Sequence, residues 1–259
     1  MKGHYWDGGL ITATKRIPTV SGSSGIFNLT SQQVFKSENA WPVQVNIASQ
    51  GLKVLLDAGD SSSYSGSGTT WSDLSGNGND AVLVGSPSYI SSPGAFDITG
   101  DNTYASLSSY SHRKNDFTYS LWVNFDAIGS EDTLFENGSW IDTLLFRVQG
   151  SNSIAVYAES ALIGTFSVSL TTGTWYNITY TRSGSTNTCY VNATQSGSTF
   201  TNQRDINLTN TNTYLMRSQH TANNQYTEGK LAHYAMYSRA LTTQEITSNF
   251  DSLKARYGY

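Results

Sequence analysis

A series of short strand-like segments begins at Gly51 and continues almost to the C-terminus of this 259-residue chain. The segments, such as Leu52–Ala58 and Phe117–Phe125, are rich in aromatic and β-branched residues, and Gly, Ser and Asn separate them. Residues of the first kind favour strands, whereas the separating residues favour tight turns. Many short strands with regularly spaced turns predict an all-β protein that folds as a two-sheet antiparallel sandwich.

The last strand of the series lies in the segment Glu228–Ile246 and leads into a short helix. Alternation of its apolar residues predicts that they share one face of the strand. The residues expected on this face are Leu231, His233, Ala235 and Tyr237. A Ser-Arg turn follows, after which Thr242 is placed to cap the helix and Glu245 to close a capping box. The sequence therefore predicts a short C-terminal helix directly after the final strand.

Four motifs, in this order along the chain, resemble those of laminin G/concanavalin A-like jelly-roll modules. They are the turn-rich stretch Trp71–Leu83, the segment Ala95–Leu107, the segment Trp175–Asn192, and the final strand with its helix, Glu228–Ile246. The resemblance covers about residues 51–255 and implies a jelly roll in which Ala95–Ile98 and Tyr104–Leu107 form a hairpin. Proteins of this family bind surfaces and sugars more often than they catalyse reactions.

Calcium is the cofactor that the resemblance implies, because related modules often hold one Ca²⁺ ion on rim loops through carboxylate and backbone oxygens. Asp101 lies in the turn of the expected hairpin and is the candidate calcium ligand. Further acidic and amide residues on neighbouring turns are Asn102, Asp73, Asp80 and Asp97. Asp and Asn also occur in turns simply because they tolerate left-handed backbone conformations, and this second interpretation is retained.

Residues 1–50 differ from the rest of the chain and are predicted to form an N-terminal arm, so the jelly-roll domain is assigned to residues 51–259. Thr30 is placed to cap a short helix over Ser31–Ser37, which Trp41-Pro42 would end. This layout resembles a short N-terminal motif in structural proteins of tailed bacteriophages. The apolar residues expected to take part in assembly are Ile26, Phe27, Leu29, Phe35 and Trp41. We expect them to attach the chain to another subunit; the alternative is that the arm packs on its own domain.

The composition restricts the partners and the location of the protein. Only 13% of the residues are charged and the net charge is −4, so the chain lacks the basic footprint of a nucleic-acid-binding protein. No apolar run approaches the thickness of a bilayer, and the N-terminus lacks the apolar core of a signal peptide. The sequence therefore predicts no membrane insertion. A polar surface with little charge suits particle-borne proteins, and release within a particle would explain an external protein without a signal peptide.

The sequence predicts no catalytic group. Jelly-roll glycoside hydrolases place carboxylates at alternate positions of one strand, so that they project into the same cleft. The nearest pattern contains Glu131 and Glu136, which are expected to face opposite sides of a strand. The histidines have no Ser or Asp partner at a recognised spacing, and His233 is expected to be a packed ring. The single cysteine, Cys189, lies in a strand pattern and is expected to be buried.

A sugar site would need exposed aromatic rings with amide and carboxylate partners around them. The aromatic residues in or near predicted loops are Tyr64, Trp71, Trp140, Tyr157 and Tyr226. Packing in the core or in an interface explains most of these residues equally well. The sequence therefore does not specify a sugar-binding residue.

Together these features predict a non-enzymatic virion structural protein, in which an attachment arm precedes one jelly roll. The expected location is the virion surface, as a head decoration, head fibre or tail-associated protein, in many copies or as a homo-oligomer. The expected partners are other virion proteins, through the arm, and surface glycans. Two alternatives are a free carbohydrate-binding lectin, which has no need of the arm, and a glycan depolymerase, which needs a pair of carboxylates.

Overall fold

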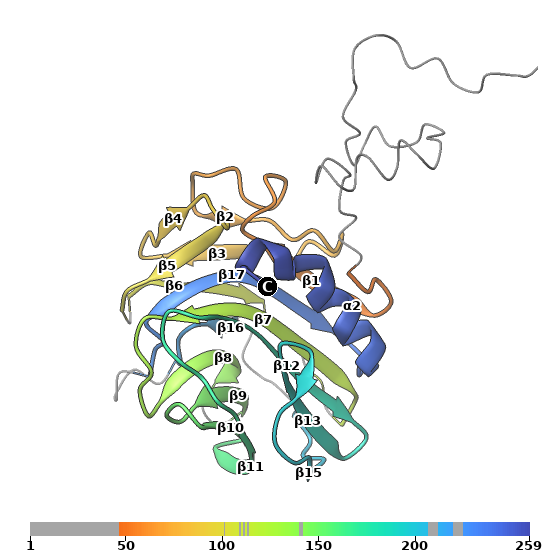
Figure 1. Cartoon of the computed structure of the whole chain (residues 1–259). Helices are drawn as coiled ribbons and strands as arrows, with labels where there is room; N and C mark the ends of the chain where they lie inside the picture. The colour runs from red at the N-terminus through yellow and green to blue at the C-terminus, as the bar shows by residue number, and fades with distance from the viewer. Residues whose placement is uncertain are drawn as a thin grey trace, which may run out of the picture. The chain divides into compact units, whose positions relative to one another are not determined.

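A computed structural model describes most of the chain after the first 46 residues. The described residues are 47–100, 102–108, 110, 112, 114–139, 142–206, 212–219 and 225–259. They form two antiparallel β-sheets and a C-terminal helical segment (Figure 1). The predicted helix Ser31–Ser37 lies outside the described residues, as do the proposed assembly residues Ile26, Phe27, Leu29, Phe35 and Trp41.

The first sheet has nine strands. They are β1 (Leu52–Asp57), β4 (Ser88–Ile90), β5 (Ala95–Ile98), β7 (Phe117–Phe125), β12 (Trp175–Ser183), β13 (Thr186–Val191), β14 (Thr194–Gln195), β15 (Phe200–Thr201) and β17 (Gly229–Tyr237). Their order is β14-β13-β12-β7-β17-β5-β4, while β1 pairs with β17 and β15 pairs with β13. The long strand β7 therefore lies at the centre of the sheet, between β12 and β17.

The second sheet has eight strands. They are β2 (Thr70–Trp71), β3 (Ala81–Val84), β6 (Tyr104–Ser108), β8 (Asp132–Ser139), β9 (Asp142–Val148), β10 (Ser153–Ala158), β11 (Ala161–Ser167) and β16 (Asn212–Leu215). Their order is β11-β10-β9-β8-β16-β6-β3-β2. The structure thus confirms the all-β, two-sheet antiparallel sandwich that the sequence predicts.

Aromatic rings from both sheets form the centre of the core. Tyr119 of β7 stacks on Phe135 of β8, with ring centroids 4.3 Å apart. Phe135 in turn stacks on Phe146 of β9, and Phe146 on Tyr180 of β12 at 5.1 Å. All four side chains are buried. Stacked aromatic pairs add to the free energy gained from burying their apolar area, so this column holds the two sheets together.

The outer face of the nine-stranded sheet is covered by the C-terminal segment, which consists of α2 (Thr243–Leu253) and the 3₁₀-helix η2 (Lys254–Tyr257). The indole ring of Trp122 on β7 stacks on Phe250 at 5.4 Å and on Tyr257 at 4.2 Å. Figure 1 shows α2 lying across this sheet. The eight-stranded sheet covers the inner face of β7, and the C-terminal segment covers its outer face. Every residue of β7 is therefore buried, although the sequence of this strand alternates in part like that of a half-exposed strand.

The predicted capping box of the C-terminal helix is confirmed. The Thr242 hydroxyl accepts a hydrogen bond from the Glu245 backbone N–H, and the Glu245 carboxylate accepts one from the Thr242 backbone N–H. The Glu245 carboxylate also binds the Arg239 guanidinium, whose Nη1 atom lies 2.8 Å from Oε2. Arg239 Nε donates to the carbonyl oxygen of Gln50 at 2.8 Å. Arg239 thus joins the first turn of the helix, at Glu245, to the backbone just before β1, at Gln50.

The structure corrects two local predictions. Strands β5 and β6 do not form a hairpin, because β5 pairs with β17 and β4 while β6 pairs with β16 and β3. The connection between them crosses from one sheet to the other. The alternation predicted for β17 is also wrong, because a β-bulge between Leu231 and His233 shifts the pattern by one residue. Leu231 therefore faces the core, whereas Ala235 and Tyr237 pack under the C-terminal helix.

Replacement of Phe250 by Ala should lower the free energy of unfolding by about 3 kcal/mol, because it removes a buried ring from the stack on Trp122. Urea unfolding followed by tryptophan fluorescence measures this change. Replacement of the neighbouring Asp251 by Ala is the control, since its ion pair with Lys254 is largely exposed and should contribute about 0.5 kcal/mol or less. Equal effects of the two substitutions would contradict the role assigned to the stack.

Candidate binding groove

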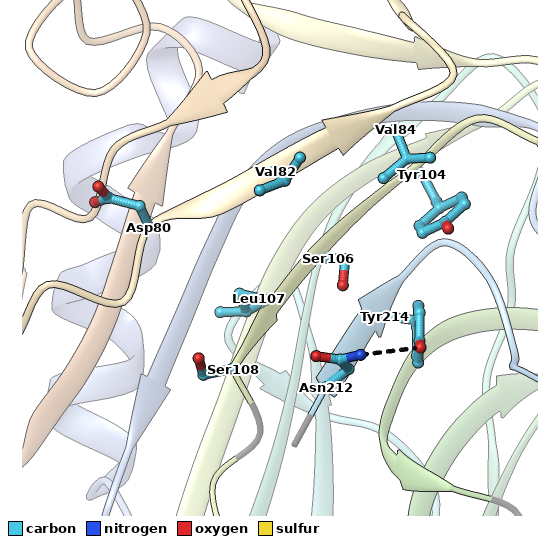
Figure 2. Close-up of a pocket in the computed structure, with 9 residues that line it drawn as sticks. All are labelled: Asp80, Val82, Val84, Tyr104, Ser106, Leu107, Ser108, Asn212 and Tyr214. Atoms are coloured by element: carbon cyan, nitrogen blue, oxygen red, sulfur yellow. Dashed lines mark hydrogen bonds between the residues drawn. The ribbon is translucent and has the colours of Figure 1, made fainter. Parts of the chain in front are cut away.

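A groove of about 360 Å³ lies on the outer face of the eight-stranded sheet, over β3, β6 and β16 (Figure 2). The residues that line it are Asp80, Val82, Val84, Tyr104, Ser106, Leu107, Ser108, Asn212 and Tyr214. Most of them occupy alternate positions of the three strands, as expected for side chains on one face of a sheet. The groove is therefore formed mainly by side chains on the outer surface of the sheet.

The register of the strands brings these side chains together. Val82 of β3 lies opposite Ser106 of β6, and Ser106 lies opposite Tyr214 of β16. The intervening residues, such as Leu83 and Ala105, point into the core. Val82 is 53% exposed although it is a valine in a strand, which marks this part of the face as uncovered by the described residues.

Two tyrosines form one wall of the groove. The rings of Tyr104 and Tyr214 are 5.8 Å apart and inclined by 55°, and both are half-buried. The Asn212 side-chain amide donates a hydrogen bond to the Tyr214 hydroxyl at 3.3 Å. Aromatic faces bordered by hydroxyl and amide groups can stack on the apolar face of a sugar ring and bind its hydroxyls.

Arg217 lies at the tyrosine end of the groove, in the segment that follows β16. Its guanidinium carbon is 4.6 Å from the centroid of the Tyr104 ring, in cation–π geometry. The side chain is half-buried, and its Nε atom is buried without a hydrogen-bond partner. The groove therefore combines stacking surfaces with a positive charge at one end.

The carboxylates of Glu131 and Glu136 are on the same face of the eight-stranded sheet, contrary to the expectation from sequence. A β-bulge between Thr133 and Phe135 shifts the alternation of β8, so that Glu136 lies opposite Leu145 on the outer face. Glu131 reaches the same face, where its Oε1 atom is 3.5 Å from Arg147 Nη1.

Both carboxylates are held by protein groups. Glu136 is fully buried and accepts a hydrogen bond from the backbone N–H of Gln219 at 2.5 Å, while Thr143 Oγ1 is 3.4 Å from its other oxygen. Glu131 accepts from the Gln225 side-chain amide at 3.1 Å in addition to its contact with Arg147. Glu136 is thus shielded from solvent, and Glu131 is engaged by two side chains on the outer face.

Two of the acidic residues on the turns considered for calcium, Asp73 and Asp80, are engaged by backbone groups of the protein. Both oxygens of Asp73 are occupied, since Oδ1 accepts from the backbone N–H groups of Leu55 and Ser75 and Oδ2 from the backbone N–H of Asn79. Asp80 accepts from the backbone N–H of Asp73. Within the described ranges, no group of three or more His, Cys, Asp and Glu side chains is arranged to hold a metal ion. Asp101, the candidate ligand, lies outside the described residues.

The aromatic residues considered from sequence do not form the groove. Tyr64 and Trp71 are buried in the core, and Tyr157 lies on β10, whereas the groove lies over β3, β6 and β16. Trp140 lies outside the described residues, and Tyr226 is half-buried in the segment before β17.

Sequence analysis missed Tyr104 and Tyr214. A signal was present in the alternation of Tyr104 with Ser106 and Ser108, which is typical of a strand with one face in solvent. That pattern shows which residues share a face, but it does not show whether another segment covers the face.

The described histidines, His112 and His233, and the cysteine Cys189 are buried. Burial, with a smaller effect of Arg182, lowers the pKa of His112 to about 3, and its Nε2 atom is 2.5 Å from the Tyr119 hydroxyl. Burial likewise lowers the pKa of His233 to about 4, which agrees with the packed ring expected from sequence. Burial raises the pKa of the Cys189 thiol, so the group is a packed apolar residue and a poor nucleophile.

The sequence matches the concanavalin A-like lectin/glucanases superfamily over residues 99–247, which is more than half of the chain. The chain therefore belongs to this superfamily. A comparison with curated protein sequences gives no match. Within the described residues, none of the helices has the length and apolar character needed to cross a lipid bilayer.

Solved structures with the same fold include binding domains and a domain of an enzyme. The binding domain of Paraclostridial Mosquitocidal Protein 1 is 16% identical, with a TM-score of 0.60 over 78% of this chain and 52% of that one. A structure of botulinum neurotoxin type C, described as dependent on two ganglioside molecules for cell entry, is 12% identical, with a TM-score of 0.61 over 78% and 51%. Domain 4 of AbnA, a GH43 extracellular arabinanase from Geobacillus stearothermophilus in complex with arabinotriose, is 16% identical, with a TM-score of 0.58 over 76% and 97%.

These similarities establish the fold, since all the identities are low. This chain spans about half the length of the mosquitocidal and neurotoxin chains and nearly all of the arabinanase domain. The fold is thus a lectin-like jelly roll.

The start of β8 contains an acidic group with a displaced pKa. Burial raises the pKa of Asp132 to about 6; the hydrogen bond from the Gly129 backbone N–H opposes this shift, and the charge of Glu228 adds to it. Because the folded state holds this proton more tightly than the unfolded state does, stability should fall as the pH rises from about 4 to about 6. Above about pH 6 the destabilisation is fully present.

Replacement of Asp132 by Asn should therefore stabilise the domain at pH 7.5 by about 1–2 kcal/mol, after allowance for partial solvation of the carboxylate. The gain should disappear near pH 4, where Asp132 is protonated in both states. Thermal unfolding at a series of pH values tests this. Asp251→Asn, at an exposed position, is the control and should leave the pH dependence of stability unchanged. If Asp132→Asn also left this pH dependence unchanged, Asp132 would not be the group with the raised pKa.

Proposed function

We propose that this chain is a non-enzymatic glycan-binding protein, and that its jelly roll binds sugars in the groove over β3, β6 and β16. The observation that supports this most directly is the pair of half-buried tyrosine rings, Tyr104 and Tyr214, beside hydroxyl and amide groups on an uncovered sheet face. Shallow sites of this composition suit ligands that offer both an apolar ring face and many hydroxyls.

The names of the structural neighbours support a sugar ligand. Two of them concern a bound or required glycan, namely arabinotriose for the arabinanase domain and gangliosides for the neurotoxin. Because fold alone does not determine function, the groove rather than the similarity supports the assignment.

The state of the carboxylates favours binding over hydrolysis. Glu136 is buried and accepts a hydrogen bond from the Gln219 backbone N–H, and Glu131 is engaged by Arg147 and Gln225. A depolymerase needs two carboxyl groups that flank the bond to be cleaved, with one of them free to donate a proton.

We further propose that the protein is a virion structural component, in which the N-terminal arm (residues 1–50) joins a particle and the jelly roll is displayed on its surface. The support is the resemblance of the arm to an N-terminal motif of tailed-bacteriophage structural proteins, together with a surface that is polar but carries little charge. A head decoration, a head fibre and a tail-associated protein share these properties. A free lectin is the alternative, since the groove would serve it equally well.

Replacement of Tyr214 by Ala should weaken glycan binding about ten-fold or more, because it removes one stacking surface of the groove. A glycan array followed by isothermal titration calorimetry of the best ligand measures the change. Tyr190→Ala, which alters a half-buried tyrosine on the other sheet, is the matched control and should bind normally. Equal binding by the two variants would exclude the groove as the sugar site, and no binding to any glycan by the wild type would exclude the function.

Quantitative mass spectrometry of purified particles should detect the full-length chain, and a variant that lacks the arm should be absent from them. The truncated chain should start at Ile47 rather than at Gly51, so that two contacts of the domain are kept. The Ala48 backbone N–H donates to Asn249 Oδ1 at 2.8 Å, and the Gln50 carbonyl oxygen accepts from Arg239. Circular dichroism should show that the truncated domain is folded. Absence of the full-length chain from particles would favour the free lectin, and incorporation of the truncated chain would exclude attachment through the arm.

A further inference from the structure

The two ends of the groove differ in charge. Figure 2 shows Asp80 at one end and Tyr104 at the other, with Val82 and Ser106 between them. Arg217 stacks on Tyr104 and so places a positive charge at the end opposite to the Asp80 carboxylate. A ligand that binds along the groove would thus meet an acidic end and a basic, aromatic end.

Arg217 differs from the other arginines that stack on aromatic rings in the described part of the chain. Arg147 is paired with Glu131, and Arg256 with Asp57. Arg182, which stacks on the Phe117 ring, donates to backbone carbonyl oxygens.

The Arg217 guanidinium, by contrast, forms no ion pair or hydrogen bond with any described residue, although the buried and unpartnered state of its Nε atom is shared by Arg147. A half-buried guanidinium that has no protein acceptor is able to bind an acidic group of a ligand.

We infer that the groove binds an acidic sugar, with the carboxylate of the pyranose ring on the Arg217 guanidinium and the ring against Tyr104 and Tyr214. This inference rests on the proposed glycan-binding function and specifies its ligand class. The planar guanidinium is suited to a carboxylate because it can donate two parallel hydrogen bonds to the two carboxylate oxygens.

The remaining groups of the groove agree with this orientation. Ser106 offers a hydroxyl for the hydroxyl groups of the sugar, and the Asp80 carboxylate can accept from a further hydroxyl. Asp80 would repel a second acidic group at its own end. The groove should therefore select a chain in which one acidic unit lies at the Tyr104 end and neutral polar groups lie at the Asp80 end.

The test measures binding of the full-length chain to a glycan array that contains neutral, uronate-containing and sialylated oligosaccharides. Titration calorimetry then compares trigalacturonate with its methyl ester, and sialyllactose with lactose, so that the two sources of a ring carboxylate are distinguished. The wild type should bind at least one acidic probe about ten-fold or more tightly than its neutral counterpart. Arg217→Gln should abolish this preference, whereas Arg217→Lys should retain part of it.

Lys254→Gln is the matched control, since it removes the same charge from the C-terminal segment on the opposite sheet, where Lys254 pairs with the exposed Asp251. Thermal unfolding should show that all the variants are folded. Equal binding of acidic and neutral probes by the wild type, or an acid preference that survives Arg217→Gln, would overturn the inference while the glycan-binding function stands. Failure to bind any glycan would overturn both.

Discussion

The stacking of the C-terminal segment on Trp122 determines which outer face of the sandwich is covered. Phe250 and Tyr257 lie against the Trp122 indole ring and convert the outer face of the nine-stranded sheet into a second core. The helix in turn depends on the capping box of Thr242 and Glu245, which begins it at the correct residue and joins it to Arg239. With one outer face covered in this way, the uncovered polar and aromatic surface lies over β3, β6 and β16.

Sequence patterns could predict the parts of the fold that depend on local chemistry. The strand Phe117–Phe125, the strand predicted over Trp175–Arg182 and observed over Trp175–Ser183, and the capping box of Thr242 follow from alternation and spacing alone. The bulges in β8 and β17 could not be predicted, because one inserted residue reverses the faces of all the residues after it without changing the composition. The crossing between β5 and β6 was missed for a related reason, since a turn-rich sequence does not indicate which sheet the next strand joins.

The groove illustrates the same division between local and non-local information. The alternation of Tyr104 with Ser106 predicts that one face of β6 is polar, and the exposed Val82 extends this face onto β3. Tyr214 lies beside Tyr104 in the groove only because β16 pairs with β6, and these two strands are more than one hundred residues apart in sequence. Local sequence patterns therefore do not predict this contact. Conversely, Trp71 belongs to a turn-rich motif but is fully buried, so the position of an aromatic residue near a loop is a poor guide to its exposure.

The groove and the first described residue of the chain lie on different sheets of the sandwich. Ile47, the first described residue, packs with Phe250 and Leu253 on the outer face of the nine-stranded sheet. The chain therefore enters the domain on the side of the sandwich opposite to Tyr104 and Tyr214. Ile47 and the C-terminal segment thus share the outer face of the nine-stranded sheet, and the same sandwich presents a covered apolar face on one sheet and a polar, aromatic groove on the other.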